Sequence, residues 1–516
     1  MKMNSNRINW LSSVIALTVT LLTFLTSTGY AQKFNSTTPS QRPAASAQSV
    51  KPAGAAAQSP AAQSQTSGKK YTFKSARAAG SMDKVTYQQD IQGQLMVPSS
   101  ENSDKNAQGA GAPEKVTIKT PNGGAVEMDA YPVKAVTKLS YNEKNIESSA
   151  DGNSFTIQAI RNYKEVNVQR TVNGAESNLA LPAGKMTLNV EFDDANCTFF
   201  HKQYCMTQDE LDVLEVMAPS TIMECLLPTT PVAIGDTWTI SEEALTSMLQ
   251  LDLLNQAQVE QVLTDVKGST AIIDAQGIAQ GEVDGVKATI SFKLKYYYSF
   301  KSNRIIWAGM VTNEERRSGP ITPDLKIETR VSMTITPITT ADDATLAAEK
   351  WVDPTDELLL IYFTSEDGTW TLFHNRFWCI FKNEPNQVIF RFMYHGQYIA
   401  QCVINKTNNP ESVKNMTLEG FKQQVWDAIN DEKVKTRSIV ATNEEVSPAN
   451  VNVFQVIAED TSDNSQWSYY MLKGSKPSEQ LVFMFMLDKT NAEIIEDSDM
   501  EMVGTLEFKT PAAANK

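Results

Sequence analysis

Cys197, His201 and Cys205 are the residues whose types and spacing come closest to a chemical site. They form a C-x3-H-x3-C pattern, and Cys225 follows twenty residues after Cys205. Thiolate sulfur and imidazole nitrogen are preferred ligands of Zn²⁺, and Cys225 or the acid pair at 193–194 would complete a set of four. The spacing matches no standard zinc signature, so a metal site is the weaker interpretation of this pattern.

A disulfide is the simpler interpretation of the same cysteines. In an oxidising compartment Cys197 can pair with Cys205, or either of them with Cys225. Three cysteines cannot all pair with one another, so one keeps a free thiol unless it reaches another chain. Cys379 and Cys402 lie within apolar strand patterns, which favours two buried small hydrophobic residues. We predict disulfide or free thiols here, with no bound metal and no cofactor.

Catalytic motifs are missing from the sequence. It contains no H-E-x-x-H, no Walker A pattern, no G-x-G-x-x-G and no C-x-x-C. A serine-hydrolase hypothesis would use Ser365, Asp367 and His374, but there is no G-x-S-x-G elbow and all three lie on one predicted hairpin. We therefore predict no catalytic residues and a protein that is not an enzyme.

Charge divides the chain into two unequal parts. The 516 residues carry a formal charge of −14, which argues against a general nucleic-acid binder. The first 70 residues hold seven basic residues and no acid, so the remaining 39 bases face 60 acids and leave a formal −21. The segment 32–70 alone carries +5. Partners of the acidic part are expected to be neutral or cationic, and the basic arm can contact an anionic surface.

The N-terminal 31 residues have the pattern of a secretory signal. Lys2 and Arg7 precede an apolar stretch that ends in small residues at Ala31, where we expect cleavage. A retained membrane anchor is the alternative, because the uncharged run is long enough to span a bilayer. Residues 32–70 are rich in Ala, Gln, Ser and Pro and predict a disordered linker. We expect an exported protein, periplasmic or extracellular, with no transmembrane segment in the mature chain.

Residues 71–340 predict a β-rich domain. Alternating and β-branched runs mark its strands, and Val286–Phe300 is the clearest because its apolar residues occupy every second position. Pairs such as Asp284-Gly285 are turn signals between runs. Two helices are expected after the caps Thr207 and Ser241. Long strands with short turns predict a large antiparallel domain, as a curved sheet, a sandwich or a partial barrel.

A second domain is predicted over residues 357–508, after a linker at 341–356 and before a disordered tail at 509–516. Five short strands, a helix capped by Thr417, four more strands and a last helix over about 491–506 give the order βββββ-α-ββββ-α. This order is typical of an α+β unit in which helices cover an antiparallel sheet. The predicted fold class is therefore mainly β plus α+β.

Two regions resemble known families. The residues that carry the resemblance are Leu226–Trp238, Glu210–Asp212 and Val283–Val286 in the β-rich part, and Tyr362–Trp370, Trp378, Ala400–Cys402 and Thr417–Phe421 in the C-terminal part. The first set resembles uncharacterised secreted bacterial proteins with a β-rich region before a smaller α+β domain. The second resembles the PsbP/Mog-like superfamily. The resemblance implies an extracytoplasmic accessory or assembly factor with helices on an antiparallel sheet, and it supplies no catalytic residues.

Three hypotheses for function follow from the sequence. The first is a non-enzymatic exported binding or assembly protein of the bacterial envelope whose partner is unknown. The second is binding of a lipid or another apolar ligand by the curved β domain, which requires an apolar cavity. The third, a metal-dependent or hydrolytic enzyme, has the least support, and no hypothesis involves nucleic acid.

Overall fold

The computed structural model describes residues 68–75, 77–99, 114–119, 125–151, 154–193, 196–406, 415–430, 436–476 and 479–509. The predicted signal 1–31, nearly all of the predicted linker 32–70 and the predicted tail beyond Lys509 lie outside these residues. Within the described part of the chain, no helix combines the length and the apolar composition that crossing a bilayer requires.

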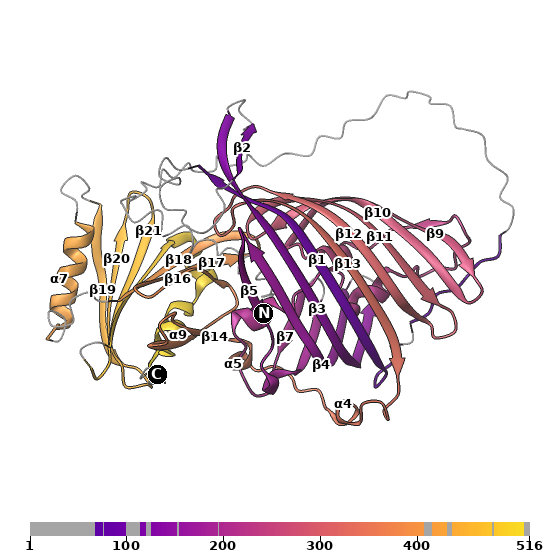
Figure 1. The fold of residues 1–516 in the computed structure, drawn as a ribbon. Helices are drawn as coiled ribbons and strands as arrows, with labels where there is room; N and C mark the ends of the chain where they lie inside the picture. Colours follow the sequence, from indigo (N-terminus) through magenta and orange to yellow (C-terminus); the bar gives the residue numbers. More distant parts are fainter. Residues whose placement is uncertain are drawn as a thin grey trace, which may run out of the picture.

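An antiparallel sheet of 13 strands dominates the fold and curves around a hollow (Figure 1). From edge to edge its strands are β7 (Asn196–Phe200), β6 (Thr187–Asp193), β4 (Ser154–Val172), β3 (Ala125–Asp151), β1 (Met82–Pro98), β13 (Asp324–Ile338), β12 (Arg304–Arg316), β11 (Val286–Ser299), β10 (Thr270–Val283), β9 (Leu253–Lys267) and β8 (Thr237–Trp238), with β2 (Glu114–Lys119) on β3 and β5 (Ala175–Leu179) on β4. The prediction of a mainly β protein with a large antiparallel sheet is confirmed, and its shape is the curved sheet.

Strand β11 shows why the sheet has one buried face. Its apolar residues from Val286 to Tyr298 include a buried residue at every second position, whereas Lys287, Lys293 and Lys295 between them are exposed. The strand begins after a turn where Asp284 and Gly285 both have positive φ, as a two-residue hairpin of this type requires. The sequence prediction for this strand and its turn is confirmed.

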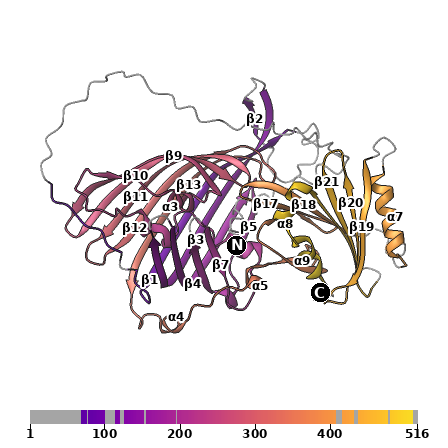
Figure 2. The ribbon, with the colours of Figure 1, turned by 180° about the vertical axis from the view of Figure 1, so that it is seen from behind.

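Residues 207–252, the inner segment, fill the hollow of the sheet. They contain α2 (Gln208–Asp212), the 3-10 helix η3 (Ser220–Leu226) and α3 (Glu242–Leu249), and Figure 2 shows α3 inside the curve. Thr207 and Ser241 cap α2 and α3 as predicted, the former with Glu210 in a capping box. Apolar side chains of the inner segment join those of the sheet in the main core.

The C-terminal unit contains two antiparallel sheets. The larger has the order β16 (Trp378–Glu384), β17 (Gln387–Tyr394), β18 (Gln397–Lys406), β22 (Gln480–Asp488), β21 (Ser465–Lys473), β20 (Asn452–Asp460) and β19 (Arg437–Val446); the smaller has the order β14 (Ile361–Thr364), β15 (Trp370–His374) and β23 (Glu507–Phe508). The helices are α7 (Leu418–Ile429), α8 (Ala492–Ile495) and α9 (Ser498–Gly504). Helix α7 packs on one face of the larger sheet, and α8 and α9 contribute to the core on the other.

The C-terminal helix differs from the prediction. One helix was expected over about 491–506, whereas the structure has α8 and α9 with a break at Glu496. The backbone φ of Glu496 is 48°, a conformation that an α-helix does not contain. The buried residues Ile495, Met502 and Val503 still meet the same core, so the break redirects the chain without exposing its apolar side.

Residues 341–356, predicted as a linker, contain structure of their own. Helix α4 (Ala344–Ala348) begins at Asp343, whose side chain accepts from the backbone N–H of Leu346 at 3.0 Å. Leu346 is buried in a small cluster with Met82 and Ile160 of the large sheet. The short helix α5 (Asp356–Leu359) follows, and the 3-10 helices η2 (Ala183–Lys185) and η4 (Lys489–Asn491) complete the elements.

The two domains meet directly at two hairpin turns. A Cβ atom at Gly285 would lie 2.5 Å from the carbonyl oxygen of Gly396 and 2.7 Å from Cε of Met393. The turn between β10 and β11 therefore packs against the turn between β17 and β18, with space for a glycine only. Cys379 and Met393 of the C-terminal unit also belong to the main core of the β domain.

Gly285→Ala is therefore expected to weaken the contact between the domains. Its matched control is Gly174→Ala, because both glycines have φ near 80° (75° and 82°) but nothing lies within 4 Å of a Cβ at Gly174. Both variants carry backbone strain, and Gly285→Ala adds a steric clash that should lower the free energy of unfolding by a further 1–3 kcal/mol or so. Chemical denaturation measures the difference, and equal losses in the two variants would contradict this contact.

Candidate functional site

The C-x3-H-x3-C pattern lies at the edge of the large sheet, next to the C-terminal domain. Cys197 is on β7, the last strand at this edge, and His201 and Cys205 are on the loop that follows it. Cys225 lies apart from them, near the end of η3 in the inner segment. The acid at position 193 ends β6, while Asp194 lies outside the described residues.

The structure does not bring these side chains together as ligands. All five cysteines are free thiols, including the disulfide candidates Cys197, Cys205 and Cys225. Among the described residues, no three His, Cys, Asp or Glu side chains form a set that could hold a metal. The ring of His201 stacks on Tyr204 at 4.9 Å between centroids, and its Nδ1 accepts from the N–H of Gln203 at 3.1 Å.

The thiols of Cys205 and Cys225 are poor nucleophiles. Burial raises the pKa of Cys225 to about 11, so its thiolate is scarce at neutral pH. Burial also raises the pKa of Cys205, whose Sγ donates to the carbonyl oxygen of Glu357 at 3.1 Å. Burial lowers the pKa of His201, and the nearby charges of Lys185 and Lys202 lower it further. The imidazole is therefore neutral in the folded protein.

Contacts of the same loop join the two domains. The loop residue Met206 forms a parallel β-bridge with Ile361, and its carbonyl oxygen accepts from the N–H of Tyr362 at 2.9 Å. Lys202 pairs with Glu349 at 2.8 Å. Together with the Cys205–Glu357 contact, these interactions tie the edge of the large sheet to the chain that enters the C-terminal domain. We call residues 197–206 and their partners the domain joint.

Arg376 is the charged residue at the centre of the domain joint. It precedes β16, and its Nη2 donates to the carbonyl oxygen of Phe199 at 2.7 Å, while Nε donates to that of Leu359 at 2.8 Å. Burial lowers the pKa of Arg376 to about 10, against the opposing influence of Glu215 and Cys197. Since the guanidinium stays charged at neutral pH, it fixes β7 to the C-terminal domain through charge-assisted hydrogen bonds.

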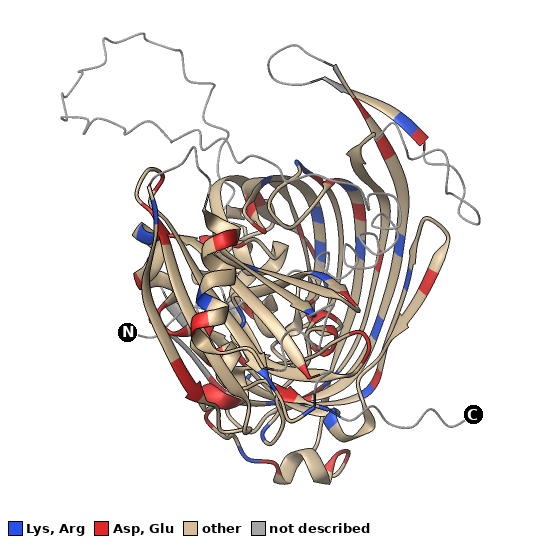
Figure 3. Cartoon of the chain, turned by 90° about the vertical axis from the view of Figure 1, so that its left-hand side faces the viewer, with Lys and Arg blue, Asp and Glu red and all other residues tan. Residues whose placement is uncertain are grey.

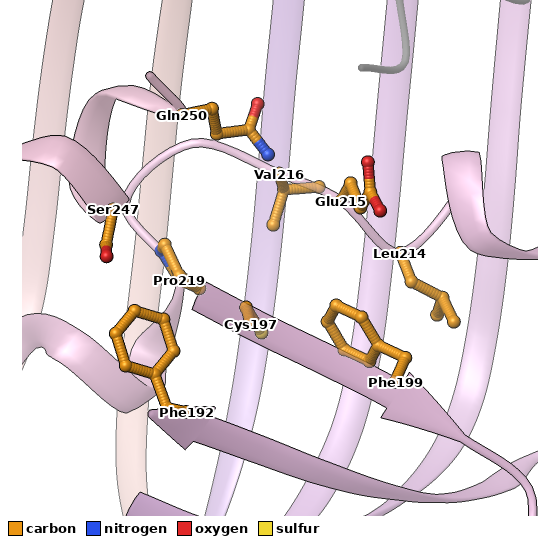
Figure 4. Close-up of a pocket in the computed structure, with 9 residues that line it drawn as sticks. All are labelled: Phe192, Cys197, Phe199, Leu214, Glu215, Val216, Pro219, Ser247 and Gln250. Atoms are coloured by element: carbon orange, nitrogen blue, oxygen red, sulfur yellow. The ribbon is translucent and has the colours of Figure 1, made fainter. Parts of the chain in front are cut away.

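A small cavity lies behind β7, between the sheet and the inner segment (Figure 4). Its lining is mostly apolar, with Cys197 on the β7 side and Glu215 on the inner segment. The full lining is Phe192, Cys197, Phe199, Leu214, Glu215, Val216, Pro219, Ser247 and Gln250. The cavity volume is about 30 Å³, enough for about two water molecules and too small for an acyl chain.

A buried ion cluster fastens the inner segment to the sheet, and sequence analysis missed it. Glu143 on β3 accepts from Nε of Arg161 on β4 at 2.6 Å and also pairs with Arg77. Ser220 of η3 donates to Glu143 at 3.0 Å, and the hydroxyl of Tyr141 lies 2.9 Å from Oγ of Ser220. The sequence signal for this cluster is a pair of charged residues, at positions 143 and 161, within long β-patterned runs that each supply a buried face.

Electrostatics make Glu143 a charged group at all ordinary pH values. Burial alone would raise the pKa of Glu143, but the charges of Arg77 and Arg161 and hydrogen bonds from Arg161 and Ser220 lower it to about 2. Arg161 also lies over the ring of Tyr141, 4.6 Å from its centroid. The buried carboxylate of Glu143 therefore has two cationic partners, Arg77 and Arg161, as a buried charge requires.

The hairpin of the C-terminal domain does not assemble a catalytic triad. Oγ of Ser365 donates to Asp367 at 2.9 Å and lies 3.1 Å from the carbonyl oxygen of Trp370. His374 instead contacts the carbonyl oxygen of its neighbour Asn375 through Nδ1 at 2.8 Å, and its ring packs on Phe390. Burial lowers the pKa of His374 to about 4. These contacts are those of a core residue.

Comparison of the sequence with protein-family models and with curated proteins finds no match.

Arg376→Ala should loosen the domain joint. The variant loses two hydrogen bonds from a charged donor, worth about 1.5–3 kcal/mol each, so the free energy of unfolding should fall by roughly 3–6 kcal/mol. The radius of gyration from small-angle scattering should also rise as the domains separate. Arg330→Ala is the control, since Arg330 forms an exposed pair with Glu328 and should change neither quantity. Scattering identical to wild type would contradict this role for Arg376.

Glu143→Gln tests the buried ion cluster through its pH dependence. The pKa of Glu143 is lowered from 4.5 to about 2 in the folded chain, so its contribution is full well above pH 4.5 and is lost as the pH falls toward 2. The stability difference between wild type and variant should shrink by about 2 kcal/mol between roughly pH 5 and pH 3. Urea unfolding at each pH measures it. The control, Glu328→Gln at an exposed pair, should give a nearly flat difference; a flat difference for Glu143→Gln refutes the assignment.

Proposed function

We propose that this protein is a non-enzymatic, exported binding or assembly protein of the bacterial envelope. The observation that carries the proposal is the domain joint. The C-x3-H-x3-C pattern lies where the edge of the large sheet meets the C-terminal domain. Its residues are Cys197, His201 and Cys205. Contacts of Phe199, Lys202, Cys205 and Met206 hold two sheet domains side by side, an arrangement suited to presenting extended surfaces to a partner.

The outer surfaces support this proposal. Basic and acidic positions are interspersed along the chain in the cartoon of Figure 3, and the chain after residue 70 has a formal charge of −21. A surface of this kind favours a neutral or cationic protein partner and repels nucleic acid. The resemblance of residues 357–508 to PsbP-like domains agrees with an accessory role, because members of that superfamily are generally not enzymes.

Binding of an apolar ligand by the β domain is the alternative. This alternative needs space on the concave face, which the inner segment occupies with buried residues such as Leu214, Met223 and Met248. The cavity behind β7 is about 30 Å³ in volume. A lipid would therefore have to displace part of the inner segment, at the cost of exposing apolar surface on both sides. We prefer the binding or assembly role for this reason.

Cross-linking in the native envelope, followed by mass spectrometry, tests the proposal. Wild-type protein should yield a reproducible partner, and Arg376→Ala should lose it while still folding, because the domains no longer hold their relative position. Arg330→Ala, at an exposed pair, serves as the control and should retain the partner. Recovery of only abundant envelope proteins, unchanged by either variant, would overturn the proposal. Stoichiometric lipid in an organic extract of the purified protein would instead favour the alternative.

A further inference from the structure

Strand β9 leaves a stretch of its outer side without a partner strand among the described residues. Its inner side pairs with β10 from Leu253 to Lys267, while β8 covers only Gln261 and Val262 on the outer side. The N–H of Gly235 donates to the carbonyl oxygen of Leu263 at 2.8 Å. Over Leu253–Glu260 no described strand pairs with the outer side of β9. We call Leu253–Glu260 the open edge.

Exposed apolar side chains gather beside the open edge. Leu253 at its start is 46% exposed, Ile278 on the neighbouring strand is 49% exposed, and Ile234 next to the Gly235 contact is 51% exposed. Ile278 is the cross-strand partner of Gln258, so it lies beside the middle of the open edge. An unpaired strand with apolar neighbours is the arrangement that accepts another strand.

Charge distinguishes this edge from the other long edge of the structure. Proteins protect edge strands with charged residues, and β19 carries Glu444 and Glu445 on its exposed edge. The open edge has the sequence LLNQAQVE, whose only charge is Glu260 at its end. The opposite edge of the large sheet, β7, is covered by the domain joint.

We propose that the open edge of β9 pairs antiparallel with the same edge of a second copy of this chain. In a two-fold antiparallel contact, a residue of one copy faces a symmetry-paired residue of the other, for example Gln256 opposite Gln258 about an axis at Ala257. Such a contact is favourable only where the facing residues do not repel. Gln256, Ala257 and Gln258 meet this condition, and they form a regular ladder with β10 after the bulge that leaves Asn255 unpaired. Two bodies of formal charge −21 approach at least electrostatic cost along such an uncharged strip. A cationic partner is disfavoured at this edge, because Glu260 is the single carboxylate within Leu253–Glu260.

Sedimentation equilibrium of the mature chain tests this dimer. The variant Gln256→Lys/Gln258→Lys places like charges opposite each other and should raise the dimer dissociation constant about tenfold or more. Gln256→Glu/Gln258→Glu should dissociate in the same way, and an equimolar mixture of the two variants should restore a dimer through opposite charges. Circular dichroism checks that each variant folds.

The matched control is Thr442→Lys/Glu444→Lys on β19, which should leave the dimer unchanged. A wild-type chain that stays monomeric at about 100 µM overturns the proposal. The proposal is also overturned if neither β9 variant changes the dimer dissociation constant, or if only the β19 variant dissociates the dimer. Either result would place the dimer contact elsewhere. The test needs no envelope partner, so its failure and the failure of the proposed function are separable.

Discussion

The fold depends on covering one broad apolar face. Alternation along strands such as β11 places large apolar residues on the concave side of the 13-stranded sheet. Exposing that side to water would strongly lower the free energy of unfolding, because apolar surface is stabilised by burial. The inner segment, residues 207–252, provides the cover. Its packing is secured by polar contacts, since Tyr87 donates to the carbonyl oxygen of Met217 at 2.7 Å and Ser220 reaches Glu143.

The same constraint explains how the domains are joined. A curved sheet that does not close has two edges, and an unpaired edge invites association. At the β7 edge the chain meets its own C-terminal domain, and Nη2 of Arg376 donates to the carbonyl oxygen of Phe199 at 2.7 Å. The loop 201–206 that carries His201 and Cys205 has the geometry of a connector. The spacing of Cys197, His201 and Cys205 is compatible with a metal site as long as only the sequence is considered. The contacts of Cys205 and Met206 in the folded chain are those of a connector between domains.

Local features were predictable from sequence, and long-range juxtapositions were not. The strand alternation in Val286–Ser299 and the caps at Thr207 and Ser241 depend on neighbours within a few residues. The ion cluster brings Glu143 to a serine 77 positions away, and only the register of β3 with β4 and the path of the inner segment determine that contact. Arg376 shows the same limit, because its partner Phe199 lies 177 residues earlier.

The inner segment belongs to the core of the β domain. Hydrogen–deuterium exchange of the mature protein tests it most directly, by comparing peptides from 207–226 and 242–249 with peptides from β1 and β13. Because the inner segment and the strands share one core, we expect slow exchange of comparable protection in all of them. Fast exchange in the inner segment beside protected strands would contradict it, and would show that the concave face opens.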